Sequence, residues 1–170
     1  MDEFTKNTAS NNYDGMFIHE LFQWAEADDP EAQCRLGICY CNGENGVEKN
    51  LEEAVQWFDS AARRGNADAQ NRLGVRYDRG EGVKEDPITA FTWFSSAAAQ
   101  GHLKAMCNLG LYYLYGRGVE KNEYKAVEWF RKAAEQGFAN AQYQLGYCYY
   151  FGEGIMQNPV KAVEWLTKAV

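Results

Sequence analysis

Residues 52–65 read EEAVQWFDSAARRG, and near copies of this stretch return three times further along the chain. The copies are ITAFTWFSSAAAQG at 88–101, YKAVEWFRKAAEQG at 124–137 and the shorter VKAVEWLTKAV at 160–170. Their tryptophans, at 57, 93, 129 and 165, stand 36 residues apart each time. A fixed period of this length is typical of a solenoid, in which each unit buries its apolar face only against its neighbours. The sequence therefore predicts a stack of similar units.

A second pattern precedes each copy and predicts a helix with one apolar face. In the second unit it consists of Ala69, Leu73, Gly74 and Tyr77, with the apolar groups four residues apart. Glycine inside a helix costs up to about 1 kcal/mol relative to alanine, so its return in every unit indicates that another helix crosses there. The other units carry Ala32-Leu36-Gly37-Tyr40, Ala105-Leu109-Gly110-Tyr113 and Ala141-Leu145-Gly146-Tyr149.

Capping residues set the bounds of the second helix in each unit. Asn50, Asp86, Asn122 and Asn158 can each accept a hydrogen bond from the first turn, and glycine ends three of the four copies. The turns NGENGV, GEGV, GRGV and GEGI follow a helix instead of a strand and lack any phosphate-binding motif, so we interpret them as tight turns. Each unit is thus a helix–turn–helix. The units span 29–65, 66–101, 102–137 and 138–170, the last one truncated.

The stretch before the first unit predicts a lone capping helix. Phe17, Leu21 and Trp24 have helical spacing, so we expect a helix within 16–28 that covers the N-terminal end of the stack. Residues 1–15 are polar and show no periodicity, so we expect them to be disordered.

Charge and composition limit the classes of partner that fit this chain. The net charge is −7 and no run of Lys or Arg interrupts it, which argues against nucleic acid and favours a basic or apolar segment. No apolar stretch reaches the roughly 18 residues of a membrane span, and MDEFTKNTAS does not resemble a signal peptide. Five cysteines form no paired spacing, so we expect reduced thiols and a cytoplasmic location.

The consensus A-x-A-Q-x-x-L-G-x-x-Y-x-x-G-x-G-V-x-x-N-x-x-K-A-V-x-W-F-x-K-A-A-E-Q-G closely resembles the Sel-one-like repeat (SLR) family, over about residues 29–170. The resemblance implies an all-α, right-handed superhelical solenoid of helix–turn–helix repeats of about 36 residues, with the first helix of each pair on the concave wall. It also implies an adaptor that assembles protein complexes. The regular cysteines of the secreted, disulfide-bonded relatives are missing here, so their extracellular setting does not carry over.

Catalytic motifs are missing from the sequence. Some relatives have been labelled penicillin-hydrolysing, but no serine has Lys three residues on, and G-x-S-x-G is absent. The two histidines, His19 and His102, do not stand in a zinc-binding pattern, and Cys39-Tyr-Cys41 lacks a second pair of ligands. We therefore expect no enzyme activity, no cofactor and no metal.

Positions that differ between the units are the candidates for a binding surface. In the first helices they are held by Asn71, Arg72, Val75, Arg76, Asp78 and Arg79, and by their counterparts in the third and fourth units. We expect an apolar groove on the concave face, flanked by arginines. Neighbour packing of the same rings is an equally open interpretation. The groove residues would be Leu111, Leu114, Tyr115, Tyr143, Tyr147 and Tyr150, with Arg72, Arg76 and Arg79 beside them.

The sequence thus favours a non-catalytic protein–protein interaction scaffold or adaptor. A dedicated inhibitor or immunity-type binder of one partner is the alternative, and a β-lactamase-like hydrolase is a weaker one. The last unit lacks the AAEQG ending and a polar capping helix, so its outer face is a candidate for self-association or for contact with a further repeat.

Overall fold

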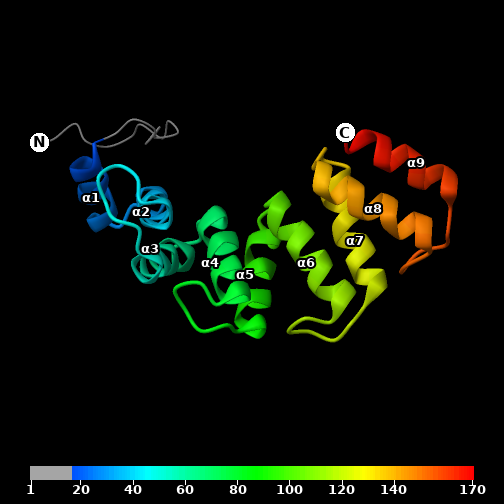
Figure 1. The fold of residues 1–170 in the computed structure, drawn as a ribbon, viewed down its shortest axis with the longest axis horizontal. Helices are drawn as coiled ribbons and strands as arrows, with labels where there is room; N and C mark the ends of the chain where they lie inside the picture. Colours follow the sequence, from blue (N-terminus) through cyan, green and yellow to red (C-terminus); the bar gives the residue numbers. More distant parts are fainter. Residues whose placement is uncertain (1–16) are drawn as a thin grey trace, which may run out of the picture.

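The computed structural model describes residues 17–170, and within them the chain forms nine α-helices and no strand (Figure 1). The expected disordered segment 1–15 lies outside the described residues. The helices follow one another along an arc, with the N-terminal helix at one end and the C-terminal helix at the other (Figure 1). Their bounds are α1 Ile18–Glu26, α2 Pro30–Asn42, α3 Leu51–Arg63, α4 Ala67–Arg79, α5 Pro87–Ala99, α6 Leu103–Tyr115, α7 Glu123–Ala134, α8 Ala139–Phe151 and α9 Pro159–Lys168.

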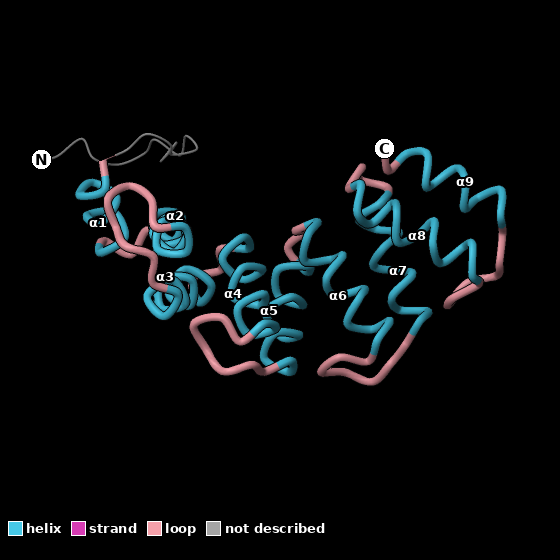
Figure 2. Tube along the Cα trace, viewed as in Figure 1, coloured by secondary structure: helices cyan, strands magenta, loops and turns pink. Residues whose placement is uncertain are grey.

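The helices pack in sequence order, which confirms the solenoid. Within a unit, α2 packs on α3, α4 on α5, α6 on α7 and α8 on α9. Between units, α3 contacts α4, α5 contacts α6, and α7 contacts α8. The longer loops join the two helices of each pair, and the short links join one pair to the next (Figure 2). Each unit therefore buries its apolar face against its neighbours.

The repeated helix glycine has the packing reason that the sequence predicts. A β-carbon at Gly37 would stand 2.5 Å from the ring of Phe58, and one at Gly74 would stand 2.7 Å from the ring of Phe94. Both phenylalanines come from the second helix of the same unit and are fully buried. The glycine therefore lets the two helices of a pair approach until the ring lies on the backbone.

The turn glycine touches the preceding unit. Gly82 has φ +73°, and a β-carbon there would collide with the backbone carbonyl of Leu51 at the start of α3. Gly118 stands in the same relation to the carbonyl of Pro87. The valine after the turn, Val119, packs against the core. The G-x-G turns thus act as contacts between units, and their form does not depend on a phosphate.

Polar side chains complete the stack. The predicted caps are confirmed, because Asn50, Asp86, Asn122 and Asn158 all accept hydrogen bonds from first-turn amides. The buried Gln70 donates from Nε2 to the carbonyl of Ala62, at 3.0 Å. Gln33 makes the same bond to the carbonyl of Ala25 in α1, also at 3.0 Å. The lone helix α1 therefore meets α2 as the second helix of one unit meets the first helix of the next.

All five cysteines are free thiols, as the sequence predicts. Four are buried and Cys41 is half-buried. Burial raises the pKa of the Cys107 thiol to about 11, and burial with the nearby Glu153 and Glu123 raises the pKa of Cys148 to about 12. These thiols stay protonated near neutral pH and serve as small apolar core residues.

Candidate interaction surface

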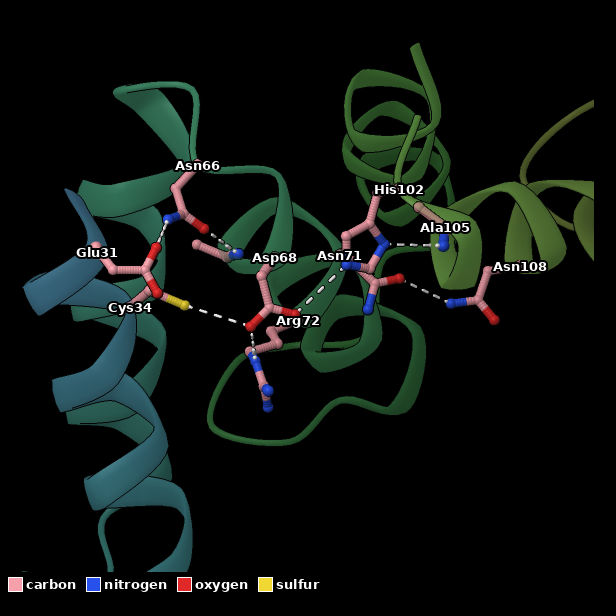
Figure 3. A network of polar contacts seen from close by, with 10 residues as sticks. Glu31, Cys34, Asn66, Asp68, Asn71, Arg72, His102, Ala105 and Asn108 are labelled. Carbon is pink, nitrogen blue, oxygen red and sulfur yellow. Dashed lines mark hydrogen bonds and ion pairs between the residues drawn. The ribbon is translucent and has the colours of Figure 1, made fainter. Parts of the chain in front are cut away.

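A network of polar contacts lies between α2, α4 and α6 (Figure 3). Its centre is the carboxylate of Asp68, which accepts a hydrogen bond from Arg72 Nε at 2.7 Å. The same carboxylate faces Cys34 Sγ at 3.7 Å and His102 Nε2 at 3.5 Å. The hydrogen bonds from His102 and Arg72 hold the pKa of Asp68 well below its usual range, against the opposing effect of burial.

This network contains a cysteine, a histidine and an aspartate but is not arranged for catalysis. Asp68 lies between Cys34 and His102, so the imidazole is not in contact with the thiol (Figure 3). His102 Nδ1 accepts the amide N–H of Ala105, at 3.2 Å, and so caps α6. Burial and the Asp68 carboxylate raise the pKa of Cys34. A nucleophile needs the opposite environment, with a lowered pKa and an adjacent base. The network is therefore a tie between three units.

The serine hydroxyls of residues 17–170 also bond to backbone carbonyls. Ser60, Ser95 and Ser96 donate to the carbonyl oxygens of Gln56, Phe91 and Thr92, each one helical turn earlier. Hence no described serine donates to a base. No group of three or more His, Cys, Asp or Glu side chains that could hold a metal occurs in this part of the chain. The longest apolar helices between residues 17 and 170 also fall short of what a membrane crossing requires.

A hollow of about 370 Å³ opens between α4, α6 and α8. Its apolar lining comes from Val75, Leu111, Phe138 and Tyr143. A volume of this size is in the range of small-ligand and side-chain pockets. The polar residues that line it are Asn71, Lys104, Asn108, Asn140 and Gln144, and Cys107 completes the wall.

A second hollow of about 220 Å³ adjoins the first. The two share Val75, Asn108 and Leu111, so they form one depression centred on α6. We call the two hollows together the α6 groove. Besides the shared residues, the second hollow is lined by Asp78, Arg79, Phe94, Tyr112, Tyr115 and Arg117.

The structure brings only part of the predicted set into this groove. Leu111 and Tyr143 line the first hollow, and Arg79 and Tyr115 join Leu111 at the second. The expectation for Leu114 is wrong, because this side chain is 3% exposed and belongs to the core cluster. Leu114 lies one turn after Leu111 on α6 and packs within this cluster.

The remaining predicted residues lie outside the groove lining. Arg72 is bound to Asp68, and Arg76 forms an ion pair with Glu81. The rings of Tyr147 and Tyr150 pack on Phe151, with ring centroids 4.4 and 4.8 Å away. These ring contacts lie within α8 itself, so they do not test the alternative that the rings pack on a neighbouring helix.

Sequence reasoning missed the groove residues at the start of the helices. Lys104 and Asn140 occupy the position that Asp68 holds in the second unit, and Phe138 occupies the capping position of Asn66. This change of chemistry at equivalent positions was a readable signal. Asn108 corresponds to Arg72, and its role depends on a contact with Asn71 that the sequence does not reveal.

A family model described as Sel1 repeat matches the chain four times, at residues 30–66, 67–102, 103–138 and 139–170. Among curated proteins, chitin synthase regulatory factor 3 of Schizosaccharomyces pombe is 42% identical over 67 residues, which are 39% of this chain and 7% of that protein.

Two solved structures are similar over most of the chain. The first is c5321, a protective antigen present in uropathogenic Escherichia coli strains, with a TM-score of 0.85 and 40% identity over 89% of this chain and 32% of that one. A Sel1 repeat protein from Oxalobacter formigenes gives a TM-score of 0.81 at 36% identity, over 89% of this chain and 62% of that one. The chain thus spans less than two thirds of the length of each of these relatives.

Proposed function

The chain belongs to the Sel1 repeat family, and we propose that it is a non-catalytic scaffold that binds a peptide or partner protein in the α6 groove. Sel1 repeats generally mediate contacts between proteins, and the repeat scaffold is typically non-catalytic. The observation that carries the proposal is the position of the groove. It lies along the first helices and, apart from Phe94, its lining residues stand at positions where the repeats differ from one another, while the repeated residues form the core.

The chemistry of the described residues supports binding in preference to catalysis. The groove combines an apolar floor with side-chain amides, which suits recognition of a polypeptide by burial and hydrogen bonds. The acidic side chain that lines it is engaged, because Asp78 accepts from the hydroxyl of Tyr112 and pairs with Arg117 Nε at 3.2 Å. A hydrolase would instead need a nucleophile beside a base. We also propose a cytoplasmic location, in keeping with five free thiols.

Affinity capture with a matched pair of variants tests this function. Leu111→Asp places a charge on the groove floor, while Ile88→Asp makes the same change on α5, where Ile88 is exposed and lines neither hollow. We expect the wild type and Ile88→Asp to retain the same partners and Leu111→Asp to lose them, with helical content unchanged by circular dichroism. Retention of the partners by a folded Leu111→Asp variant would contradict the proposal.

The same capture separates an adaptor from a dedicated binder of one partner. Mass spectrometry of the proteins lost from Leu111→Asp gives their number, and titration gives their affinity. Several weakly held proteins support an adaptor. One stoichiometric protein held at nanomolar affinity or tighter supports an inhibitor or immunity-type role.

A further inference from the structure

The α6 groove holds hydrogen-bond donors that have no acceptor within residues 17–170. Asn71 is only 6% exposed, and its Oδ1 accepts from Asn108 Nδ2 at 3.1 Å (Figure 3). Its own Nδ2 donates to no described group. Lys104, on the wall of the same hollow, forms no ion pair in this part of the chain. Lys104 is exposed to solvent. A ligand that covers these donors without offering acceptors would pay for their desolvation, so this hollow is suited to a ligand that brings acceptors.

The start of α8 adds further donors at the edge of the hollow. The side chains of Asp29, Asn66 and His102 cap α2, α4 and α6 by accepting an amide N–H of the first turn. Phe138 holds that position in α8 and makes no side-chain cap, although it lines the hollow together with Asn140. The first amides of α8 therefore keep their partial positive charge beside Lys104.

Carboxylates around the groove are already neutralised. Asp78 is bound by Tyr112 and Arg117, as described above, and Asp68 is bound by Arg72. By contrast Arg79, at the second hollow, is exposed and reaches Glu81 only at 3.8 Å. The lining of the groove thus holds three basic side chains, Lys104, Arg79 and Arg117, and one acidic side chain, Asp78, on a chain whose net charge is −7. The sequence predicts a basic partner from the negative net charge of the chain, whereas the local charge of the groove is positive.

We propose that the α6 groove binds an extended peptide segment in which a carboxylate stands beside apolar side chains. This inference rests on the proposed function and specifies the partner of the same site. The carboxylate faces Lys104 and the start of α8, and the apolar side chains lie over Val75 and Leu111. An extended segment fits better than a helix, because its backbone carbonyls are free to accept from the amide of Asn71, whereas those in a helix interior are engaged within the helix.

Selection from a phage-displayed library of random heptapeptides on the full chain tests the partner chemistry. Enriched sequences are then synthesised with a fluorescent label and measured by anisotropy, each beside a copy with Gln or Asn for its acidic residues and a copy with Lys. We expect the acidic form to bind about tenfold more tightly than the amide form, and the Lys form to bind more weakly still. Amidated and free carboxyl termini distinguish a side-chain carboxylate from a terminal one.

Two charge reversals locate the contact. Lys104→Glu changes the groove wall, and Lys84→Glu makes the same change on an exposed residue of the turn after α4, outside both hollows. We expect Lys104→Glu to lose about tenfold in affinity for the acidic peptides, and Lys84→Glu to bind as the wild type does.

The outcomes separate this inference from the proposed function. Enriched peptides that are basic or neutral, or unchanged affinity in folded Lys104→Glu, overturn the acidic partner while the groove remains a binding site. If no peptide is enriched, the inference of an acidic peptide partner is also overturned. The scaffold function is then tested separately, by the capture experiment with Leu111→Asp.

Discussion

Gly74 and Phe94 meet so closely that a β-carbon on the glycine would stand 2.7 Å from the ring of the phenylalanine. The same contact joins Gly37 to Phe58 and Gly110 to Phe130. The three rings are at most 2% exposed and pack against their neighbours, so an added methyl group would press on a packed ring. This contact sets the distance between the two helices of a pair, and hence the shape of the face on which the α6 groove lies.

Gly74→Ala should therefore destabilise the protein although alanine favours helices. We expect a loss of about 1–3 kcal/mol in the free energy of unfolding, the range for overpacked cores, measured by urea denaturation. Arg79→Ala, at an exposed position of the same helix, should change it by less than about 0.5 kcal/mol. A Gly74→Ala protein as stable as the wild type would show that the ring can move aside.

Asp68 should make the free energy of unfolding fall at acidic pH. Its pKa is lowered in the folded state, so its contribution is present above the unfolded pKa near 4 and is lost as pH falls through the folded value. Asp68→Asn should lower the urea midpoint at pH 7 and flatten its decline below pH 4. Parallel pH profiles for the two proteins would mean that Asp68 gains nothing from Arg72 and His102.

Cys107 should produce the opposite dependence. Its pKa is raised by burial to about 11 from an ordinary value near 9, so the stability it contributes is full below pH 9 and declines as pH rises toward 11. Under reducing conditions, Cys107→Ala should be less stable at pH 7 but lose less of its stability between pH 8 and pH 10.5. Equal losses in the two proteins would contradict a buried thiol.

In the 170-residue chain, the exposed Val163 on α9 should contribute to any contact between copies. Val163 is 64% exposed, whereas Val127, its counterpart in α7, is 3% exposed beneath the next unit. Val163→Glu should shift any concentration-dependent dimer toward monomer in sedimentation experiments. Val160→Glu is the matched control, because Val160 is 70% exposed and its counterpart Tyr124 is equally exposed at 67%. An unchanged dimer in Val163→Glu would place the contact elsewhere.

The repeated residues were the predictable part of this protein. Tryptophan spacing, caps and the glycine in each first helix have local or periodic causes, so one sequence is enough to predict the pairs of helices. The groove was harder, because Leu111 and Leu114 look alike in sequence and only the packing of neighbouring units buries one of them. The pairing of Arg72 with Asp68, four residues earlier, was readable from spacing alone.

The most direct test of the account is photo-cross-linking from single positions in a native lysate. A benzophenone amino acid at position 111 probes the groove floor, and the same group at position 88 probes the exposed surface of α5. We predict a discrete adduct with a partner protein from position 111, competed by the acidic peptides, and none from position 88. Adducts from position 88 alone, or the same adducts from both, would contradict the claim that the α6 groove is the binding surface.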